Sequence, residues 1–515
     1  MEKVFQLKKN GTNVRTEIVA GLTTFMTMAY IIALNPNLLT NFGAEGQELW
    51  NGVFLATCIA SAIGTICMAF LANKPFAMAP GMGLNSFFAV VVANIVAITG
   101  ATYLESFQTA LVVIFVEGVV FIILSILNVR EKIVEAIPLG VRLGIGPAIG
   151  LMLMNIGLGS NVSLYNTAFE GPFFALRDFF GALTASSAKE AMGDAYPAMV
   201  LSVITMFFGL FVIIALNHKK VKGSVLYGML AASVLNWAGQ AIFLGTNPFE
   251  KLVGASFVPP FADLAKTTLF KLNFAGVADI GWFTLITLVI TFCIIDMFDT
   301  IGTLVGTASR AKMLDKDGNM PQMKEALLSD AIGTVVGSVT GTSTVTTFVE
   351  SASGVEAGGR TGLTALTTGI LFLLCMFIAP VAAVIPPAAT SSALIYVGIL
   401  MLANLKKIDF FAVKGPQEVY DSLGALVQGK EFHGGLTKMT SLRWVRSVPQ
   451  AETLVVFAEK IDDFTPISSL VNLTYCRGWS MDGGSMATAL GDLSFLAPCR
   501  KLRKLELPGS AYSNT

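Results

Sequence analysis

Long apolar runs separated by short polar segments fill the first 405 residues of the chain. A bilayer core about 30 Å thick needs about 20 mostly apolar residues for each helix that crosses it. Twelve runs fit this requirement and are predicted as spans: 18–39, 51–72, 76–96, 107–128, 133–157, 196–216, 224–245, 281–308, 326–340, 343–358, 362–384 and 388–405. The pattern therefore predicts an all-α polytopic membrane protein.

Basic residues between the spans indicate the orientation. Cytoplasmic loops are enriched in Lys and Arg. If the N-terminus is inside, the inside segments carry Lys74, Arg130, Lys132, Lys219, Lys220, Lys222, Arg310, Lys312, Lys316, Lys324, Arg360, Lys406 and Lys407. The long outside loops, 158–195 and 246–280, hold few basic residues. We therefore expect the protein to lie in the plasma membrane. Both the N-terminus and the C-terminal tail are expected on its cytoplasmic side. No cleavable signal peptide is expected, because the first apolar run has the full length of a span.

Composition narrows the function further. The chain is 54% hydrophobic and 13% charged, and its formal net charge is zero, which argues against nucleic acid as a partner. Six cysteines without a CxxC pair and two histidines in polar stretches give no basis for a metal site, and we expect no cofactor. No motif for ATP binding or hydrolysis is present, so we expect no catalytic residue.

Two spans break the usual helix pattern. The segment 75–88 contains two prolines, two glycines and Asn85, and the segment 337–354 is rich in Thr before it reaches Glu350. Non-helical backbone at membrane depth is tolerated where it is buried in protein or lines a cavity. These are the third and tenth spans, seven apart. The spacing predicts two inverted seven-span repeats whose discontinuous spans form a binding site.

Carboxylates inside the spans are the second signal. An Asp or Glu at the centre of a span costs about 2.5 to 3.5 kcal/mol on insertion scales and so marks a pathway or a proton relay. Asp296 and Thr300 lie four residues apart on one helix face, and Asp299 lies close to that face. We predict that Asp296 and Glu350 bind substrate and couple protons. For Asp299, a role in the substrate or proton site and a role in tying helices together are equally well supported. For Glu117, a contact between helices is the favoured interpretation.

Several longer motifs resemble those of the azaguanine-type purine permeases, a branch of the nucleobase-ascorbate transporter superfamily. They are Thr16 to Ile31 with Asn35-Pro36, Ala79 to Asn85, Asp296 to Thr303, Gly341 to Gly354, and Ala357 to Gly362. The resemblance implies fourteen spans in two inverted repeats, a core and a gate domain, and an elevator-like motion. It also implies uptake of adenine, guanine and hypoxanthine coupled to protons.

The resemblance maps substrate binding onto Asn85, Asp296 and Glu350, with Thr300 and Ser351 as neighbours in the expected site. Gly83 is expected to allow close backbone approach and Phe348 to offer a stacking face. The expected partners are a purine base, the coupling proton, the lipid bilayer and a second copy of the chain in a homodimer.

The polar tail departs from the family. We divide the chain into a permease domain, 1–407, and a tail, 408–515, where the family's last two spans are expected but absent. Spaced leucines in the tail look like leucine-rich repeats, in which Pro466, Leu470, Leu473 and Tyr475 align with Pro498, Leu502, Leu505 and Leu507. Two or three such units are too few to bury a continuous core. An unrelated sequence joined to a truncated permease is favoured over an evolved regulatory domain.

Other functions stay open from the residues alone. The substrate could be another nucleobase, such as xanthine or uracil. A chain without its last two spans could also fail to transport and act as a membrane scaffold or sensor through its tail. An intramembrane enzyme with Asp296 and Asp299 as an acid pair is disfavoured, because both carboxylates lie on one helix.

Overall fold

The computed structural model describes most of the predicted spans and part of the tail. The described residues are 2–41, 45–127, 139–159, 162, 164, 175, 179–184, 189, 192–310, 313, 320–403, 407–409, 431–436, 445–446, 451–458, 465–480 and 497–506. Two compact units result. One contains Met1–Pro138 and Met152–Val397, and the other contains Leu139–Leu151 and Gly398–Thr515.

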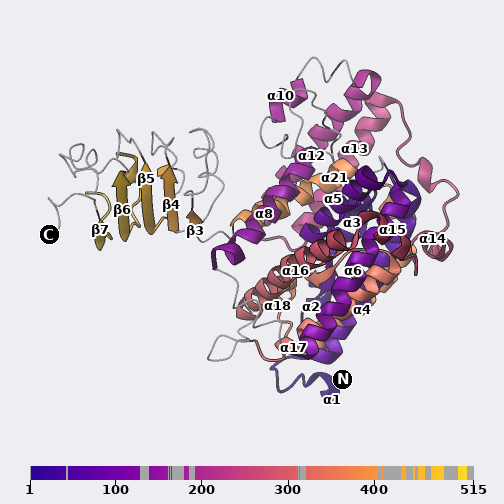
Figure 1. The fold of residues 1–515 in the computed structure, drawn as a ribbon, viewed down its shortest axis with the longest axis horizontal. Coiled ribbons are helices and arrows are strands. Elements are labelled where there is room, and N and C mark those ends of the chain that lie inside the picture. Colours follow the sequence, from indigo (N-terminus) through magenta and orange to yellow (C-terminus); the bar gives the residue numbers. More distant parts are fainter. Residues whose placement is uncertain are drawn as a thin grey trace. The chain divides into compact units, whose positions relative to one another are not determined.

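Helices dominate the described residues up to Ala403 (Figure 1). The longer helices are α2 (Val14–Met28), α3 (Ile31–Leu39), α4 (Trp50–Cys67), α5 (Met82–Thr99), α6 (Tyr103–Ile126), α8 (Leu139–Leu158), α12 (Tyr196–His218), α13 (Ser224–Gly239), α16 (Trp282–Arg310), α17 (Met323–Thr340), α19 (Gly362–Cys375) and α21 (Pro387–Ala403). The shorter α-helices are α1 (Glu2–Phe5), α10 (Phe179–Thr184), α14 (Phe261–Thr267), α15 (Phe274–Ile280), α18 (Ser351–Glu356) and α20 (Ala379–Ala383). Two strands, β1 (Met78–Pro80) and β2 (Val345–Thr347), lie between helices. Short 3-10 or π turns are η2 (Gln47–Leu49), η3 (Met68–Ala72), η5 (Gly193–Ala195), η6 (Gln240–Leu244), η7 (Glu250–Leu252) and η8 (Met376–Ile378).

Each predicted span has a counterpart among these elements. Eight helical stretches in the described part of the chain are long and apolar enough to cross a membrane, and 147–158 and 387–402 are shorter apolar helices. The two remaining predicted spans, 326–340 and 343–358, correspond to α17 and to β2 followed by α18. The prediction of an all-α polytopic membrane protein is therefore confirmed.

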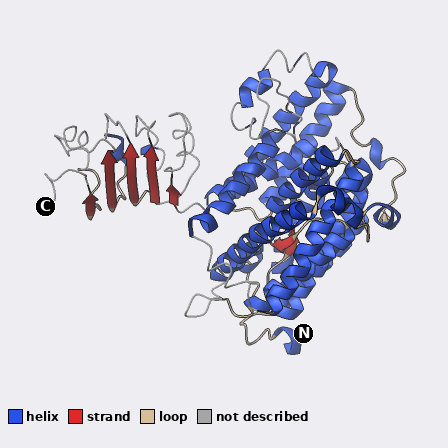
Figure 2. Ribbon diagram, in the orientation of Figure 1, coloured by secondary structure: helices blue, strands red, loops and turns tan. Residues whose placement is uncertain are grey.

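The third and tenth spans are discontinuous, as the sequence predicts. Each begins with a three-residue strand and continues as a helix, and the two strands pair antiparallel, with Ala79 opposite Thr346. Figure 2 shows this pair in red among the blue helices. The prediction that an extended piece meets a half-helix in each span is confirmed.

Threonine hydroxyls complete the hydrogen bonding of the two strands. The Thr65 hydroxyl in α4 accepts from Met78 N (2.9 Å) and donates to Met78 O (3.1 Å). The Thr334 hydroxyl in α17 does the same for Val345 N and O, both at 3.2 Å. Backbone groups at membrane depth need such partners because no water is there to replace them.

Packing repeats between the two halves of the first unit. Seven spans apart, α2 corresponds to α16, α4 to α17 and α6 to α19. The corresponding helices α4 and α17 pack against each other. The contact of α17 with α6 corresponds to that of α4 with α19, and the contact of α6 with α16 corresponds to that of α19 with α2. Exchanging each element for the one seven spans away reproduces the same set of contacts. This is the arrangement that two inverted repeats require.

The crossing of α4 and α17 carries the same tetrapeptide twice. Residues 62–65 and residues 331–334 both read Ala-Ile-Gly-Thr. Gly64 and Gly333 meet at the crossing, because a Cβ built on Gly333 would lie 3.4 Å from the Gly64 Cα. Small residues allow such close approach of membrane helices. The following Thr65 and Thr334 are thereby placed beside the strands.

The described part of the tail forms a parallel sheet. Its strands are β3 (Lys407–Asp409), β4 (Glu431–Leu436), β5 (Thr453–Ala458), β6 (Tyr475–Ser480) and β7 (Lys504–Glu506), in sequential order, with the 3-10 turn η11 (Thr465–Ser469) between β5 and β6. Paired positions recur every 22 residues from Glu431 through Thr453 to Tyr475. Leu454, Leu470 and Leu473 are fully buried. The described residues from Lys407 onwards therefore contain five paired strands, more than the two or three units expected.

The expected alignment within the tail is wrong by three residues. β6 and β7 pair Tyr475 with Lys504, not with Leu507. In agreement with this register, Leu473 N donates to Leu470 O, and Leu502 N donates to Cys499 O. Leu502, rather than Leu505, is thus the equivalent of Leu473. The error arises because the leucines are spaced three residues apart. An alignment shifted by three residues therefore still places leucine opposite leucine.

Candidate functional site

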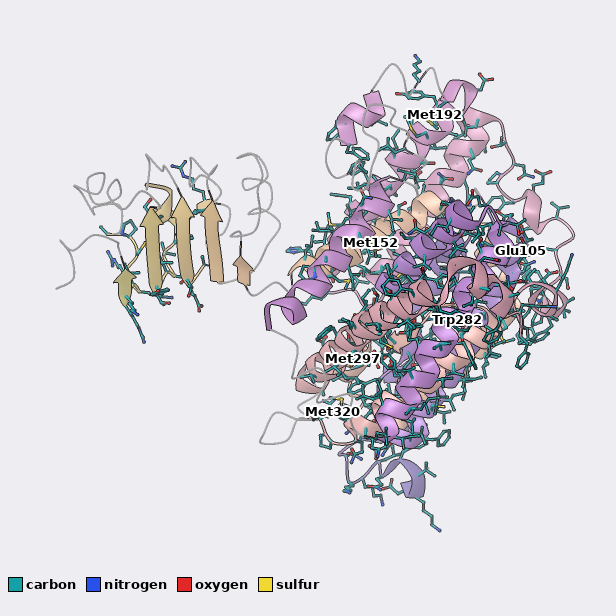
Figure 3. The ribbon with its side chains drawn as sticks, in the orientation of Figure 1. Glu105, Met152, Met192, Trp282, Met297 and Met320 are labelled. Carbon is teal, nitrogen blue, oxygen red and sulfur yellow. The ribbon has the colours of Figure 1, made fainter. Side chains whose placement is uncertain are left out.

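Asp296, Thr300 and Asp330 form a buried cluster between α16 and α17. All three side chains are fully buried. The Thr300 hydroxyl lies 3.0 Å from Asp296 Oδ1, one helical turn away, and 3.0 Å from Asp330 Oδ1. Met297, labelled in Figure 3, marks this part of α16. Asp296 and Thr300 share one helix face, as predicted, and Asp330 contacts Thr300 from the next helix.

Asp299 lies beside the same cluster. Its carboxylate interacts electrostatically with Thr346 of β2, Asp330 and Glu350. Asp299 therefore connects the middle of α16 with the strand pair and with the start of α18.

Glu350 is the N-cap residue of α18 and is partly buried. The Tyr30 hydroxyl donates to Glu350 Oε1 at 2.7 Å, and the Thr27 hydroxyl donates to the Glu350 carbonyl at 3.4 Å. Tyr30 is fully buried and precedes α3. The first span therefore orients a carboxylate of the tenth span.

Asn85 bridges the two discontinuous spans. Its amide Nδ2 donates to Pro80 O at 3.2 Å, and its Oδ1 accepts a short hydrogen bond from the Ser343 hydroxyl. The side chain is fully buried in α5. Asn85 thus ties the end of β1 to the segment before β2.

Ser351 and Phe348 also contact the other discontinuous span. Ala77 N donates to Ser351 Oγ at 3.0 Å, and Phe348 N donates to Ala77 O at 3.0 Å. The Phe348 side chain is buried. Gly83 is buried in the first turn of α5, where helix N–H groups carry a partial positive charge.

Glu117 makes a contact inside the protein, but its partner Thr344 lies in the segment before β2 and not in a helix as the sequence favours. Its Oε2 accepts from the Thr344 hydroxyl at 2.7 Å, and the side chain is fully buried in α6. The bond holds the segment before β2 against α6, so Glu117 supports the strand pair.

Negative charge concentrates in this region. Asp296, Asp299, Asp330 and Glu350 all belong to the second half of the chain, and the Thr300 and Tyr30 hydroxyls contact three of these carboxylates. The Asp296 and Asp330 oxygens lie no more than twice the 3.0 Å contact apart. Two unit charges about 6 Å apart repel by about 3 kcal/mol at an effective dielectric constant of about 20.

Tyr30 and Asp330 are site residues that the sequence analysis did not select. Asp330 lies near the start of the predicted span 326–340, where a carboxylate fits a membrane boundary. The repeated Ala-Ile-Gly-Thr tetrapeptide could have placed it beside the strands. Tyr30 lies within a motif of the resemblance, but only the fold brings it to Glu350. Among the described residues, no group of three His, Cys, Asp or Glu side chains could hold a metal ion.

Paired short strands, discontinuous spans and internal two-fold packing define a multi-pass membrane transporter with an inverted-repeat fold. The transmembrane domain of the cyanobacterial bicarbonate transporter BicA has a similar fold, with a TM-score of 0.55 and 16% identity over 76% of this chain and 88% of that one. The overall structure of SLC26A9 matches with a TM-score of 0.51 and 12% identity over 76% of this chain and 58% of that one.

The chain belongs to the Permease family (Xan_ur_permease), whose model matches residues 15–420. Adenine permease AdeP of Escherichia coli is 34% identical over 427 residues, which cover 83% of this chain and 84% of AdeP. Guanine/hypoxanthine permease PbuG of Bacillus subtilis is 38% identical over 424 residues, which cover 81% of this chain and 87% of PbuG.

Proposed function

We propose that the chain is a secondary active transporter that takes up purine nucleobases, namely adenine, guanine and hypoxanthine, by proton symport. It lies in the plasma membrane as a homodimer, with its N-terminus and tail in the cytoplasm. The two repeats move relative to each other in an elevator-like motion that exposes the site to one side and then the other.

The cluster of carboxylates beside the paired strands is the observation that carries this proposal. Purine rings present N–H groups, and an ionised carboxylate accepts hydrogen bonds from such donors with about twice the strength of a neutral acceptor. The relatives named adenine permease and guanine/hypoxanthine permease support a purine as the base. A carboxylate in a buried site can also load and release a proton.

We assign the roles as follows. Asp296 and Glu350 accept hydrogen bonds from the base and change protonation during transport. Thr300 and Tyr30 orient these carboxylates through the hydrogen bonds described above. Phe348 supplies a stacking face for the ring.

The remaining predicted residues shape the site. Asn85 and Ser351 hold the two discontinuous spans together. Gly83 lets the base approach the start of α5, where the helix N-terminus favours electron-rich groups.

Uptake of radiolabelled hypoxanthine or adenine into cells that lack purine transport tests the proposal. We expect uptake by the unmodified chain and its loss in Asp296→Asn and in Glu350→Gln. Asp279→Asn, a matched change at an exposed carboxylate of α15, is the control and should transport normally. Normal uptake by both site variants would refute the assignment of the site.

Competition identifies the base. Unlabelled adenine, guanine and hypoxanthine should inhibit uptake, whereas xanthine and uracil should not. Uptake of labelled uracil or xanthine that adenine, guanine and hypoxanthine do not inhibit would replace this set of substrates while leaving the transporter assignment intact.

A further inference from the structure

The connection between α13 and α16 exposes large apolar side chains. Between 51% and 79% of the residue surface is exposed in Val253, Phe257, Val258, Phe261, Phe270 and Phe274. α14 and α15 lie within this connection, and each buries an apolar side, Leu264 in α14 and Val277 in α15. The buried sides hold the connection on the protein. The exposed side forms an apolar patch of the kind that marks an interaction surface.

Hydrogen bonds fix this connection at the ends of three spans. Asn51, in the first turn of α4, donates to Asp263 Oδ2 of α14 at 2.6 Å. Gln108, near the start of α6, donates to the last carbonyl of α14 at 2.8 Å, and Phe270 N donates to Val339 O in the last turn of α17 at 2.8 Å. Successive spans run in opposite directions, so these three helix ends lie on the same side of the membrane. The connection therefore lies where the spans leave the hydrocarbon core.

Phe270 occupies a backbone conformation that disfavours a bulky side chain. Its φ is 54°, in the left-handed region where glycine is the usual residue. The backbone thus gives no reason for an aromatic residue here. Packing within the chain gives none either, because Phe270 is 75% exposed. A contact of the ring with something outside the chain supplies the reason.

The exposed surface of the connection continues onto a span. α16 exposes Trp282, Phe283, Ile286 and Ile290, and the spacing of four between three of them places those three on one helix face. Trp282, labelled in Figure 3, stands at the start of this face. α15 packs against α16, which joins the two surfaces. Because α16 is long and apolar enough to cross the membrane, its exposed apolar face suits lipid.

We propose that the connection between α13 and α16 is an interfacial anchor, which inserts its aromatic side chains into the boundary between phospholipid headgroups and acyl chains on the side opposite the N-terminus. Aromatic side chains are favoured at this boundary. The exposed Lys266 and Lys271 suit it as well, because a lysine stem can lie along apolar surface while its ammonium reaches the headgroups. The anchor does not depend on which base the protein carries.

Quenching of tryptophan fluorescence by brominated phospholipid tests the position of Phe270. The full chain is reconstituted into vesicles of phosphatidylethanolamine and phosphatidylglycerol whose acyl chains carry bromine close to the headgroup. Trp282→Phe should lose part of the quenching, and adding Phe270→Trp to this variant should restore it. Bromine at the ends of the acyl chains should quench the restored tryptophan less.

Val471→Trp, at an exposed apolar position of the tail, is the matched control in the Trp282→Phe background. It should add fluorescence that the brominated lipid does not quench. If the tryptophan of Phe270→Trp is instead quenched by iodide in the water and not by the brominated lipid, the proposal is overturned.

Photocrosslinking identifies what covers the surface. Phe270→p-benzoylphenylalanine, irradiated in vesicles with a radiolabelled acyl chain, should label phospholipid more strongly than the same substitution at Val471. Crosslinking to a second copy of the chain, crosslinking within the chain, or labelling no stronger than at Val471 would overturn the proposal.

Thermal unfolding separates the anchor from a role in folding. Phe270→Gly relieves the backbone and removes the ring, so in detergent it should unfold at the temperature of the unmodified chain or above it. Added phospholipid should raise the midpoint of the unmodified chain more than that of the double variant Phe257→Ser with Phe270→Gly. An equal rise in both would show that these rings do not contact lipid and would contradict the proposal.

Discussion

Replacement of Glu17 should reveal how the first span is fixed to α19. Glu17 is fully buried in α2, and its carboxylate accepts from three backbone N–H groups at the start of α19: Arg360 N at 2.8 Å, Thr361 N at 3.2 Å and Thr364 N at 3.2 Å. The hydroxyls of Thr361 and Thr364 also donate to it, at 2.9 Å and 2.6 Å. A carboxylate at a helix N-terminus is favoured both by these donors and by the helix dipole.

The magnitude follows from these donors. A hydrogen bond to a charged group contributes about 1.5 to 3 kcal/mol, and a buried donor left without a partner costs about 1 to 3 kcal/mol. The two hydroxyls can rotate to other acceptors, whereas the three N–H groups cannot. We therefore expect Glu17→Ala to destabilise the protein by about 3 to 5 kcal/mol, because three N–H groups each lose an acceptor at about 1 to 2 kcal/mol.

Glu17→Gln should have a smaller effect. The amide keeps one oxygen for the crowded Oε2 position, where four of the five donors lie, and turns its NH₂ towards Arg360 N. The hydrogen bond from Arg360 N is lost, and this N–H then faces the NH₂ group of the glutamine. The loss costs about 1 to 3 kcal/mol.

Thermal unfolding of the purified protein in detergent, followed by tryptophan fluorescence, measures both effects. The unfolding midpoint should fall in the order wild type, Glu17→Gln, Glu17→Ala. Glu356→Ala, at an exposed position of α18, is the control and should unfold with the wild type. Equal midpoints for Glu17→Ala and Glu356→Ala would show that the network contributes no net stability.

Three further experiments test other parts of the structure. Tyr30→Phe removes the 2.7 Å hydrogen bond to Glu350 and should weaken apparent hypoxanthine affinity about tenfold, or 1.4 kcal/mol, whereas an unchanged KM would exclude this orienting role. Gly354→Ala places a Cβ against Thr24 Oγ1 and should lower the yield of monodisperse protein. Adding Thr24→Ala to this variant should restore part of the yield, and no restoration would refute the clash. Burial raises the pKa of the Cys476 thiol to about 12, with Cys499 as a lesser cause, so the folded tail favours the neutral thiol. The stability that the buried neutral thiol of Cys476 contributes is therefore complete below the ordinary thiol pKa near 9. It is lost as the pH rises from there towards 12, because the unfolded chain then gains stability by ionising this thiol. Cys476 should resist maleimide at pH 8 until the tail unfolds, and rapid labelling of folded protein would contradict its burial.

Much of the membrane fold was predictable because span formation is a local property. Twenty apolar residues must form a helix in lipid whatever surrounds them, so length and hydropathy locate the spans. Glycine, proline and threonine interrupt the third and tenth spans for a local reason as well, since they disfavour a continuous helix. The pairing of Ala79 with Thr346, however, joins residues far apart in the sequence.

The candidate site was predictable only in part. Asp296 and Glu350 stand out because a carboxylate in the middle of an apolar span is costly. Asp330 does not stand out, because it lies near the beginning of its span and only the tertiary fold brings it to Thr300 of α16. The slipped alignment in the tail has a similar cause: leucine spacing repeats every three residues, and backbone pairing alone selects the register.

The sequence by itself determined that this chain crosses a membrane many times, that two of its spans are broken, and that carboxylates lie within them. These properties depend on the composition of single segments and on the cost of placing polar groups in lipid. The tertiary structure alone decided which hydroxyl serves which carboxylate, because Tyr30 and Glu350 meet only when the two repeats pack around their shared strand pair. Such contacts depend on helix crossings, which no single segment encodes.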